Sequence, residues 1–483
     1  MSLYISAWAI SALLVQTSVG NAKAFVERGR VTGTDSRAFS FLYELFMIYF
    51  EPSGSGICGL CIYIMDKRRL TIFILEKGIS FIFCLLFMSC GNPINTVLDP
   101  NFTQEGNYIG ETTETFVVSQ PSQVNFYVEV SGSMNGFFRA NKATEFKDDV
   151  WSIVSNFGNP GVYVLSNQGT VLKKYSSNDF QKRMISGSFV SAASTKVPVM
   201  METILQDLNY NNGACSVLIS DMKYSPVGTA GMPVLLSMYQ TDVRNLVGKY
   251  EGLSISIIAA TSDYLGNKMN CPDSPYYYVI MGRDKEVAYL RNRIITLLEK
   301  NKNYVDSIEM GFDYKSPAFT FGISNNCIQL GNEPCFTDYD CSYNDTCSVK
   351  LNLDLSDFRW TIADENMLRQ NFMVKSAYGA SVEIGKITLE VDNHYNREFV
   401  RKAIANIELK VNNMPNDSDV ILWYLNHPDQ YMNETLLDYL SGQEENDCTK
   451  SFSVDKFIAG IFNAIQNKWT KEPNRILISK SRQ

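Results

Sequence analysis

The sequence is poor in histidine and in clustered positive charge, and each shortage argues against a class of function. Only two histidines occur among 483 residues, which argues against histidine-based catalysis and histidine-rich zinc sites. Lys and Arg are spread along the chain and the net charge is -8, so the basic stripe that neutralises phosphates is missing. We therefore predict a protein that does not bind nucleic acid.

The usual motifs of nucleotide-binding and hydrolytic enzymes are also missing. No P-loop is present, and no glycine-rich dinucleotide fingerprint follows the first predicted strand. A serine hydrolase elbow would read Gly-x-Ser-x-Gly, whereas residues 132–136 read Gly-Ser-Met-Asn-Gly. A catalytic triad would need His394 or His427, which both lie much later in the chain. We expect no enzymatic activity, and a metal-dependent hydrolase around Asp221 is the weaker alternative.

Residues 65–90 have the composition of a secretory signal. A basic segment begins at Met65, and residues 79–88 form an apolar run, shorter than the roughly 20 residues of a membrane-spanning helix. The following Ser-Cys-Gly resembles the lipobox of bacterial lipoproteins, with Cys90 as the residue that receives the lipid. This resemblance implies a lipoprotein anchored at the cell envelope, in the outer membrane, facing either the periplasm or the cell surface.

The segments on either side of this signal show little periodicity. We interpret residues 1–64 as a mis-assigned or disordered extension upstream of a start at Met65. The alternative is that residues 1–24 are themselves a signal peptide, although they lack an early positive charge. Residues 91–121 are rich in Asn, Thr, Gly and Pro and predict a weakly ordered tether.

Residues 122–302 alternate short apolar strands with amphipathic helices. Strands are predicted at residues 124–130, 161–165, 216–221, 254–259 and 276–281. Helices are predicted at residues 146–157, 197–208, 241–250 and 286–300. Such alternation is typical of βαβ units, so we predict an open, doubly wound α/β domain with a mostly parallel sheet. Ligands of such domains bind at the carboxyl ends of the strands.

The first predicted strand runs into Glu-Val-Ser-Gly-Ser, residues 129–133. This resembles the DxSxS loop of von Willebrand factor A domains, with Glu in place of the leading Asp. In that family the loop forms a metal-ion-dependent adhesion site, which a Thr from a second loop and an Asp after the fourth strand complete. The resemblance implies that Mg²⁺ or Mn²⁺ is held by oxygen atoms of Glu129, Ser131, Ser133, Thr195 and Asp221.

This resemblance also implies a function. A cation held mainly by hydroxyl groups stays electrophilic, so that an acidic side chain of a protein ligand completes its shell. The chain departs from the family in Glu129 and in Met222-Lys223, which stand where Gly commonly follows the Asp. We expect a protein-binding or adhesion module. The alternative is a structural envelope protein with the same fold and no functional metal site, in which the two serines only cap the following turn.

After residue 303 the pattern changes to successive strands with few helices. Strands predicted at residues 308–314, 318–323, 348–355, 371–376, 381–391 and 407–411 indicate an antiparallel β-sandwich over residues 303–423. Residues 327–347 form an insertion with four cysteines: Cys327, Cys335, Cys341 and Cys347. We expect disulfides there rather than zinc, because tight Cys-x2-Cys pairs are missing. Cys271 and Cys448 are candidates for another pair.

Residues 424–483 predict a helical tail. Ser453 is a good N-cap, and the apolar residues between Val454 and Ile465 lie on one stripe of the helix that follows. Two explanations of this stripe stay open: packing against the sandwich, which we favour, and contact with a membrane or a partner.

Overall fold

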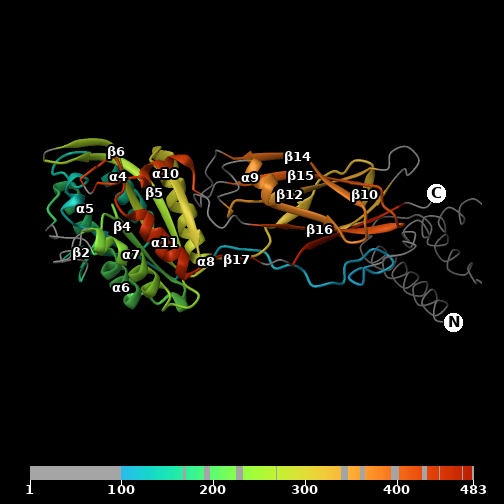
Figure 1. Ribbon diagram of the computed structural model, residues 1–483, viewed down its shortest axis with the longest axis horizontal. Helices are drawn as coiled ribbons and strands as arrows, with labels where there is room; N and C mark the ends of the chain where they lie inside the picture. Colours follow the sequence, from blue (N-terminus) through green and yellow to red (C-terminus); the bar gives the residue numbers. More distant parts are fainter. Residues whose placement is uncertain are drawn as a thin grey trace, which may run out of the picture. The chain divides into compact units, whose positions relative to one another are not determined.

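The computed structural model describes most of the chain after the predicted signal. The described residues are 99–166, 170–189, 196–224, 232–267, 269–338, 346–358, 365–392, 402–426, 432–444, 446–469 and 472–480 (Figure 1). The predictions for residues 1–64 and 65–90, with Cys90, lie outside these ranges, as do those for Thr195 and Cys341. None of the helices in the described ranges is long and apolar enough to cross a membrane.

The larger sheet has seven strands in the order β3-β2-β1-β4-β6-β5-β7. They are β1 (Gln123–Glu129), β2 (Gly161–Ser166), β3 (Val171–Tyr175), β4 (Ala214–Ser220), β5 (Ser254–Leu265), β6 (Asn270–Gly282) and β7 (Tyr304–Met310). β1 pairs in parallel with β2 and β4, and the other neighbouring strands pair antiparallel. The mixed α/β fold is confirmed, but the prediction of a mostly parallel sheet is wrong. The short connections β2–β3 and β5–β6 favour antiparallel pairs, because a parallel pair needs a long crossover.

Helices cover both faces of this sheet. α4 (Glu145–Ser155), α5 (Ser177–Ser186) and α8 (Asp284–Asn301) contribute to the core on one face, and α6 (Val197–Asp207) and α7 (Met232–Val247) to the core on the other. Strand β1 shows why both faces are apolar. Phe126 and Val128 belong to the first core, and Tyr127 between them belongs to the second. Successive strand residues point to opposite faces, so a strand covered on both sides reads as a continuous apolar run.

A second, β-rich body contains two sheets, ordered β10-β11-β18-β16-β13 and β14-β15-β12-β9. Their strands are β9 (Phe319–Phe321), β10 (Cys327–Gln329), β11 (Cys335–Asp338), β12 (Cys347–Asp354), β13 (Phe372–Ser376), β14 (Ser381–Val391), β15 (Ala403–Asn412), β16 (Ser418–Leu425) and β18 (Asn474–Ser479). Apart from the parallel pair β11–β18, neighbouring strands are antiparallel. Phe319 of one sheet packs on Trp423 of the other with ring centroids 4.9 Å apart, so apolar faces of the two sheets meet.

Two strands belong to a different body from the one that the sequence predicted for their residues. β7, expected in the β-rich body, pairs with β5 of the larger sheet. β18, within the predicted helical tail, pairs with β11 and β16. Both are short strands, and the local pattern of a short strand does not say which sheet it joins.

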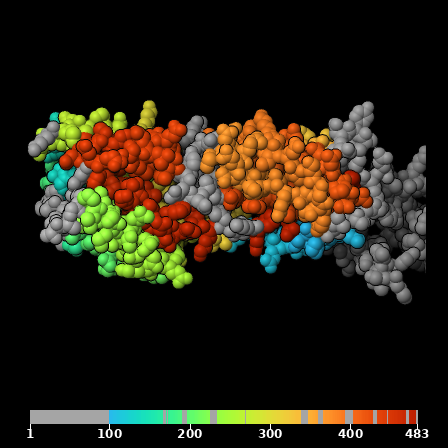
Figure 2. Space-filling view, viewed as in Figure 1, coloured from blue at the N-terminus to red at the C-terminus, as the bar shows by residue number. Residues whose placement is uncertain are grey.

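The tail also contains the helices α10 (Glu434–Leu440) and α11 (Val454–Ala464). The apolar stripe of α11 packs against α7 of the α/β body, so the predicted packing against the sandwich is wrong. Figure 2 shows residues of this C-terminal stretch, in red, beside the green of α7. Ser453 precedes α11 as predicted, but it makes no side-chain capping bond, because its backbone is in the left-handed region, with φ 62°, and not in the extended conformation of an N-cap.

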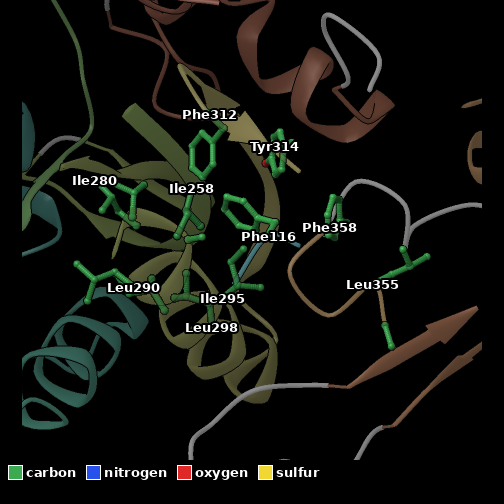
Figure 3. Packing of buried hydrophobic residues seen from close by; sticks show 14 of the residues in the cluster. Phe116, Ile258, Ile280, Leu290, Ile295, Leu298, Phe312, Tyr314, Leu355 and Phe358 are labelled. Carbon is green, nitrogen blue, oxygen red and sulfur yellow. The ribbon is translucent and has the colours of Figure 1, made fainter. Parts of the chain in front are cut away.

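The α/β body and the β-rich body share one apolar core. The ring of Phe116 lies 5.2 Å from that of Tyr314 and 6.1 Å from that of Phe358, centroid to centroid (Figure 3). Phe358 follows β12, and Tyr314 ends β8 (Asp313–Tyr314), which pairs with β17 (Lys468–Trp469) of the C-terminal stretch. These rings therefore connect segments that are distant in the sequence.

Candidate functional site

The loops that follow β1 and β4 lie side by side at one edge of the larger sheet. β1 and β4 are parallel neighbours, with Val128 opposite Ile219, so both loops leave the sheet at the same level. Carboxyl ends of parallel strands share an edge, which is where open α/β sheets bind ligands. The structure therefore brings together four of the five predicted site residues: Glu129, Ser131, Ser133 and Asp221. Thr195, the fifth, lies outside the described residues.

Hydroxyl groups form the centre of this cluster. The Oγ atoms of Ser131 and Ser133 are 2.8 Å apart, and the side chain of Ser133 also forms a hydrogen bond with the carboxyl group of Asp221. The short helix η1 (Ser133–Gly136) shapes the loop, and its Met134 is fully buried. The sulfur of Met134 accepts the backbone N–H of Asp221 at 3.2 Å, so the two loops contact each other directly.

Both carboxyl groups of the site are buried. Glu129 and Asp221 are each 2% exposed. Glu129 accepts a hydrogen bond from the Ser220 hydroxyl, which in turn accepts the backbone N–H of Met222 at 2.7 Å. Burial raises the pKa of Asp221, while the positive charge of Lys223 and the hydrogen bond from Ser133 act in the opposite direction. Negative charge at this place is thus costly unless a cation compensates it.

Met222 has a backbone conformation that favours glycine. Its φ is 57°, in the left-handed region, which costs roughly 1–2 kcal/mol for most residues other than Gly. The side chain is fully buried in the core beneath α6 and α7, which offsets the strain. The turn lets the backbone N–H of Lys223 donate to Asp221 Oδ1 at 3.2 Å. The departure from glycine noted in the sequence therefore leaves the turn intact.

The oxygen atoms of the cluster fit a small divalent cation. Two adjacent ligands of an octahedral Mg²⁺, each at about 2.1 Å from the ion, are roughly 3 Å apart. The two serine oxygens have nearly this separation, 2.8 Å, and Asp221 adjoins them through Ser133. In the described part of the chain no group of three or more His, Cys, Asp or Glu side chains could hold a metal. An ion here would therefore depend on the hydroxyl groups, and the assignment of Glu129 as a ligand stays a prediction.

Several neighbours of the site were not predicted from the sequence. A Cβ added to Gly136 would lie 2.4 Å from the ring of Tyr264, so only glycine lets this ring of β5 lie against the loop after β1. The Lys223 ammonium group donates to the backbone carbonyl of Asp447 at 2.8 Å. Glycine is common in loops, so Gly136 gave no recognisable signal in the sequence, and Lys223 was noted there only as a residue beside Asp221.

The cysteines have two different outcomes. Cys271, on β6, forms a disulfide with Cys448, and their Cα atoms are 6.1 Å apart. This is the pair that the sequence suggested without assigning it. Three cysteines of the predicted disulfide-stapled insertion lie on strands and are buried: Cys327 on β10, Cys335 on β11 and Cys347 on β12. Disulfides within that insertion stay a prediction.

Comparison of the chain with protein-family models, curated proteins and solved structures found no match.

Proposed function

We propose that the α/β body is a von Willebrand factor A-like protein-binding module that holds Mg²⁺ or Mn²⁺ in a variant adhesion site. The observation that carries this proposal is the convergence of two serine hydroxyls and one buried carboxyl group at the carboxyl edge of the sheet. Ser131, Ser133 and Asp221 would hold the ion, together with Thr195 from the predicted second loop. The ion would supply an electrophilic position for an acidic side chain of a protein ligand. The module itself would catalyse no reaction.

Divalent cations should stabilise the full chain if this proposal is correct. Mn²⁺ or Mg²⁺ at 100 times its dissociation constant adds about 2.7 kcal/mol of stability by linkage, which a thermal melt detects. The shift should disappear in Ser131→Ala and in Asp221→Asn. Ser155→Ala, on the exposed surface of α4, is the matched control and should keep it. If neither ion changed the melting temperature of the parent protein, the result would contradict the metal site.

The same proposal places the protein at the cell envelope, anchored through lipid on Cys90. The disulfide between Cys271 and Cys448 supports an extracytoplasmic location, because disulfides persist mainly in oxidising compartments. Cys90→Ser should move the protein from the membrane fraction to the soluble fraction. Unchanged fractionation of this variant would remove the lipid anchor from the proposal.

A structural envelope protein without a functional metal site is the second candidate. The burial of Asp221, which is 2% exposed, favours it, because a partner's side chain would have to reach a covered group. The nearby charge of Lys223 favours it as well, because it opposes a second cation. The thermal melts separate the two candidates, since only the first predicts a metal-dependent shift.

A further inference from the structure

Strand β3 and helix α5 carry a group of unpaired cations, which we call the basic edge: Lys173, Lys174, Lys182 and Arg183. The three lysines are exposed and Arg183 is half-buried. Among the described residues none of these four side chains forms an ion pair. The chain as a whole has a net charge of -8, so positive charge is concentrated at this edge without internal compensation.

The acidic residue of α5 is engaged elsewhere. Asp179 lies in the first turn of the helix, where its carboxyl group accepts the hydroxyl of Ser176 at 2.8 Å. The two cations of α5 lie closer to the other end of the helix.

Tyrosine rings hold three of the four cations in place. The charged groups of Lys173 and Arg183 lie 5.4 and 5.3 Å from the centroid of the Tyr175 ring. The ammonium group of Lys174 lies 5.7 Å from that of Tyr163. Tyr175 packs against the first core and Tyr163 against the second, so the cations lie on both faces of the sheet. Side chains that are already ordered lose less entropy when a partner binds.

The strand register places the basic edge close to the candidate site. Lys173 lies opposite Val164 of β2, and Val164 lies opposite Val128 of β1. Neighbouring strands are about 4.8 Å apart, so the backbone of Lys173 is roughly 10 Å from Val128, the residue before Glu129.

The end of α5 also contacts the loop that follows η1 of the site. A Cβ added to Gly187 would lie 3.0 Å from the Cα of Ala140. The guanidinium group of Arg183 donates to the carbonyl of the next residue, Ser188, at 2.9 Å. The basic edge and the first loop of the candidate site are therefore neighbours on one side of the α/β body.

β3 is the last strand on its side of the sheet. Among the described residues no strand pairs with its outer side. An extended segment that lies along such an edge places successive side chains on alternate faces of the sheet. Acidic side chains of that segment would thus meet Lys173 on one face and Lys174 on the other. Lysines on an edge strand discourage pairing with other strands in general, but opposite charge favours an acidic one.

We propose that the basic edge receives an acidic segment of the protein ligand whose side chain completes the shell of the ion at the candidate site. This inference rests on the proposed function and names the chemistry of its partner. The negative charge of the rest of the chain repels a long polyanion or an anionic membrane, whereas a short acidic segment meets mainly the basic edge. A protein segment therefore fits this surface better than nucleic acid or lipid does.

The direct test titrates a fluorescein-labelled oligoglutamate peptide with the full chain and follows its fluorescence anisotropy. The double variant Lys173→Glu/Lys174→Glu should bind on the order of tenfold more weakly or worse, because like charges then face each other. Lys386→Glu/Lys402→Glu, at exposed lysines of the β-rich body, changes the net charge equally and should bind like the parent. If the double reversal impairs folding, Lys173→Gln/Lys174→Gln should still weaken binding.

Titrations with Mn²⁺ and with chelator separate this inference from the proposed function. If Mn²⁺ tightens binding and the substitutions on β3 leave the affinity unchanged, the basic edge is overturned and the metal site stands. If the substitutions weaken binding but Mn²⁺ has no effect, the basic edge stands and the metal site is contradicted. No binding by the parent in either condition would overturn the inference.

The same titration with other polyanions tests the class of partner. Duplex DNA and phosphatidylglycerol vesicles should bind the parent more weakly than the peptide does at the same salt concentration. Binding of either as tight as that of the peptide would overturn the acidic protein segment as the occupant of the basic edge.

Discussion

Two buried groups of charged residues in this chain are built in opposite ways. The first, which we call the matched cluster, pairs opposite charges and lies at the core that the two bodies share. In it Arg291 and Glu309 form an ion pair at 2.5 Å, with side chains 0% and 4% exposed. At the candidate site two buried carboxyl groups lie among hydroxyls, and the nearby ammonium group, that of Lys223, is half-buried. A buried charge that is paired within the protein needs no bound ion. Buried carboxyl groups that have only hydroxyl neighbours keep a negative charge that a bound cation can compensate.

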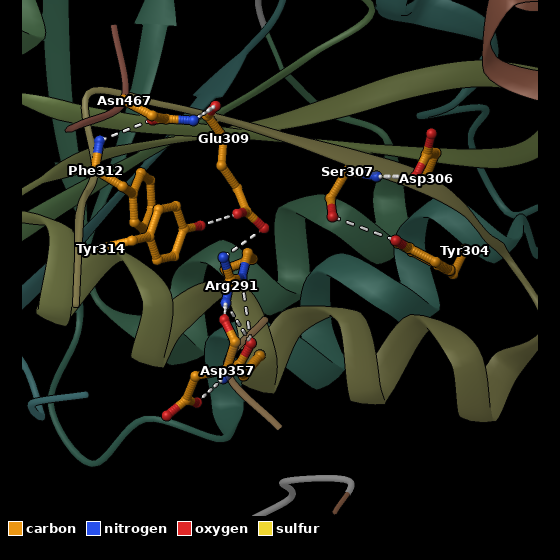
Figure 4. A network of polar contacts seen from close by, with 10 residues as sticks. Arg291, Tyr304, Asp306, Ser307, Glu309, Phe312, Tyr314, Asp357 and Asn467 are labelled. Atoms are coloured by element: carbon orange, nitrogen blue, oxygen red, sulfur yellow. Dashed lines mark hydrogen bonds and ion pairs between the residues drawn. The ribbon is translucent and has the colours of Figure 1, made fainter. Parts of the chain in front are cut away.

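Further hydrogen bonds extend the matched cluster to Asp357 and Tyr314. Arg291 donates to the Asp357 carbonyl at 2.8 Å (Figure 4). Asn292 donates to the Asp357 carboxyl group at 2.7 Å. The hydroxyl of Tyr314 donates to Glu309. Asp357 belongs to the segment after β12, so helix α8 of one body is tied to the other body through this cluster.

The largest effect is expected from breaking the matched pair. Arg291→Met leaves Glu309 buried without its ion-pair partner, which should lower the free energy of unfolding by roughly 3–5 kcal/mol in a urea titration. Adding Glu309→Leu should restore much of this loss, because the uncompensated charge is then gone. Lys249→Met is the control, since Lys249 and Glu202 form an exposed pair at 3.8 Å that contributes at most about 1 kcal/mol. A loss below about 1 kcal/mol for Arg291→Met would show that the buried ion pair contributes little to the free energy of unfolding.

An intermediate effect, dependent on pH, is expected at Asp306 of β7. This residue accepts the backbone N–H groups of Asn433 and Ser307, each at 2.8 Å. Burial raises its pKa from 3.8 to about 6 in spite of these bonds. The unfolded chain then releases this proton at lower pH than the folded protein does. Stability contributed by the protonated form is therefore present below the unfolded pKa and is lost as pH rises from about 4 to about 6.

Asp306→Asn should remove this pH dependence. A shift of about two pKa units corresponds to roughly 2–3 kcal/mol, so the variant should gain that much relative to the parent between about pH 4 and pH 7. The measurement is the difference between parent and variant free energies of unfolding across that range, in which other titrating groups cancel. Parallel profiles for the two proteins would contradict the raised pKa.

The sequence predicted most of the elements that carry the site, because apolar periodicity is local. The strands expected at residues 124–130 and 216–221 correspond to β1 and β4, and the helix expected at 286–300 corresponds to α8. β3 and α5 were missed, and α7 begins nine residues before its expected start, at Met232. Strand partners were harder to predict: the pattern of β6 is that of any buried strand, and only its antiparallel pairing with β4 and β5 makes the sheet mixed.

The same distinction holds for polar residues. Ser131, Ser133 and Asp221 could be predicted as neighbours, because loops after parallel strands share an edge. Lys223 was noted as a charge beside Asp221, but its link to Asp447 joins residues more than two hundred positions apart. Arg291 and Glu309 lie on an ordinary helix and an ordinary strand, and nothing in either local pattern indicates a buried ion pair. Contacts that depend on how separate elements pack remain hidden in one sequence.

The smallest effect is expected at the site itself, in the absence of metal. Ser131→Ala removes one hydroxyl, whose bond to Ser133 is 2.8 Å long, and should cost about 1 kcal/mol in a urea titration with chelator present. The lost partner is a neutral hydroxyl, so no buried carboxyl group loses an ion-pair partner. A loss as large as that of Arg291→Met would mean that the serine cluster is a structural centre like the matched pair. A small loss, together with a vanished Mn²⁺ response, would mean that these hydroxyls contribute more to the ion than to the fold.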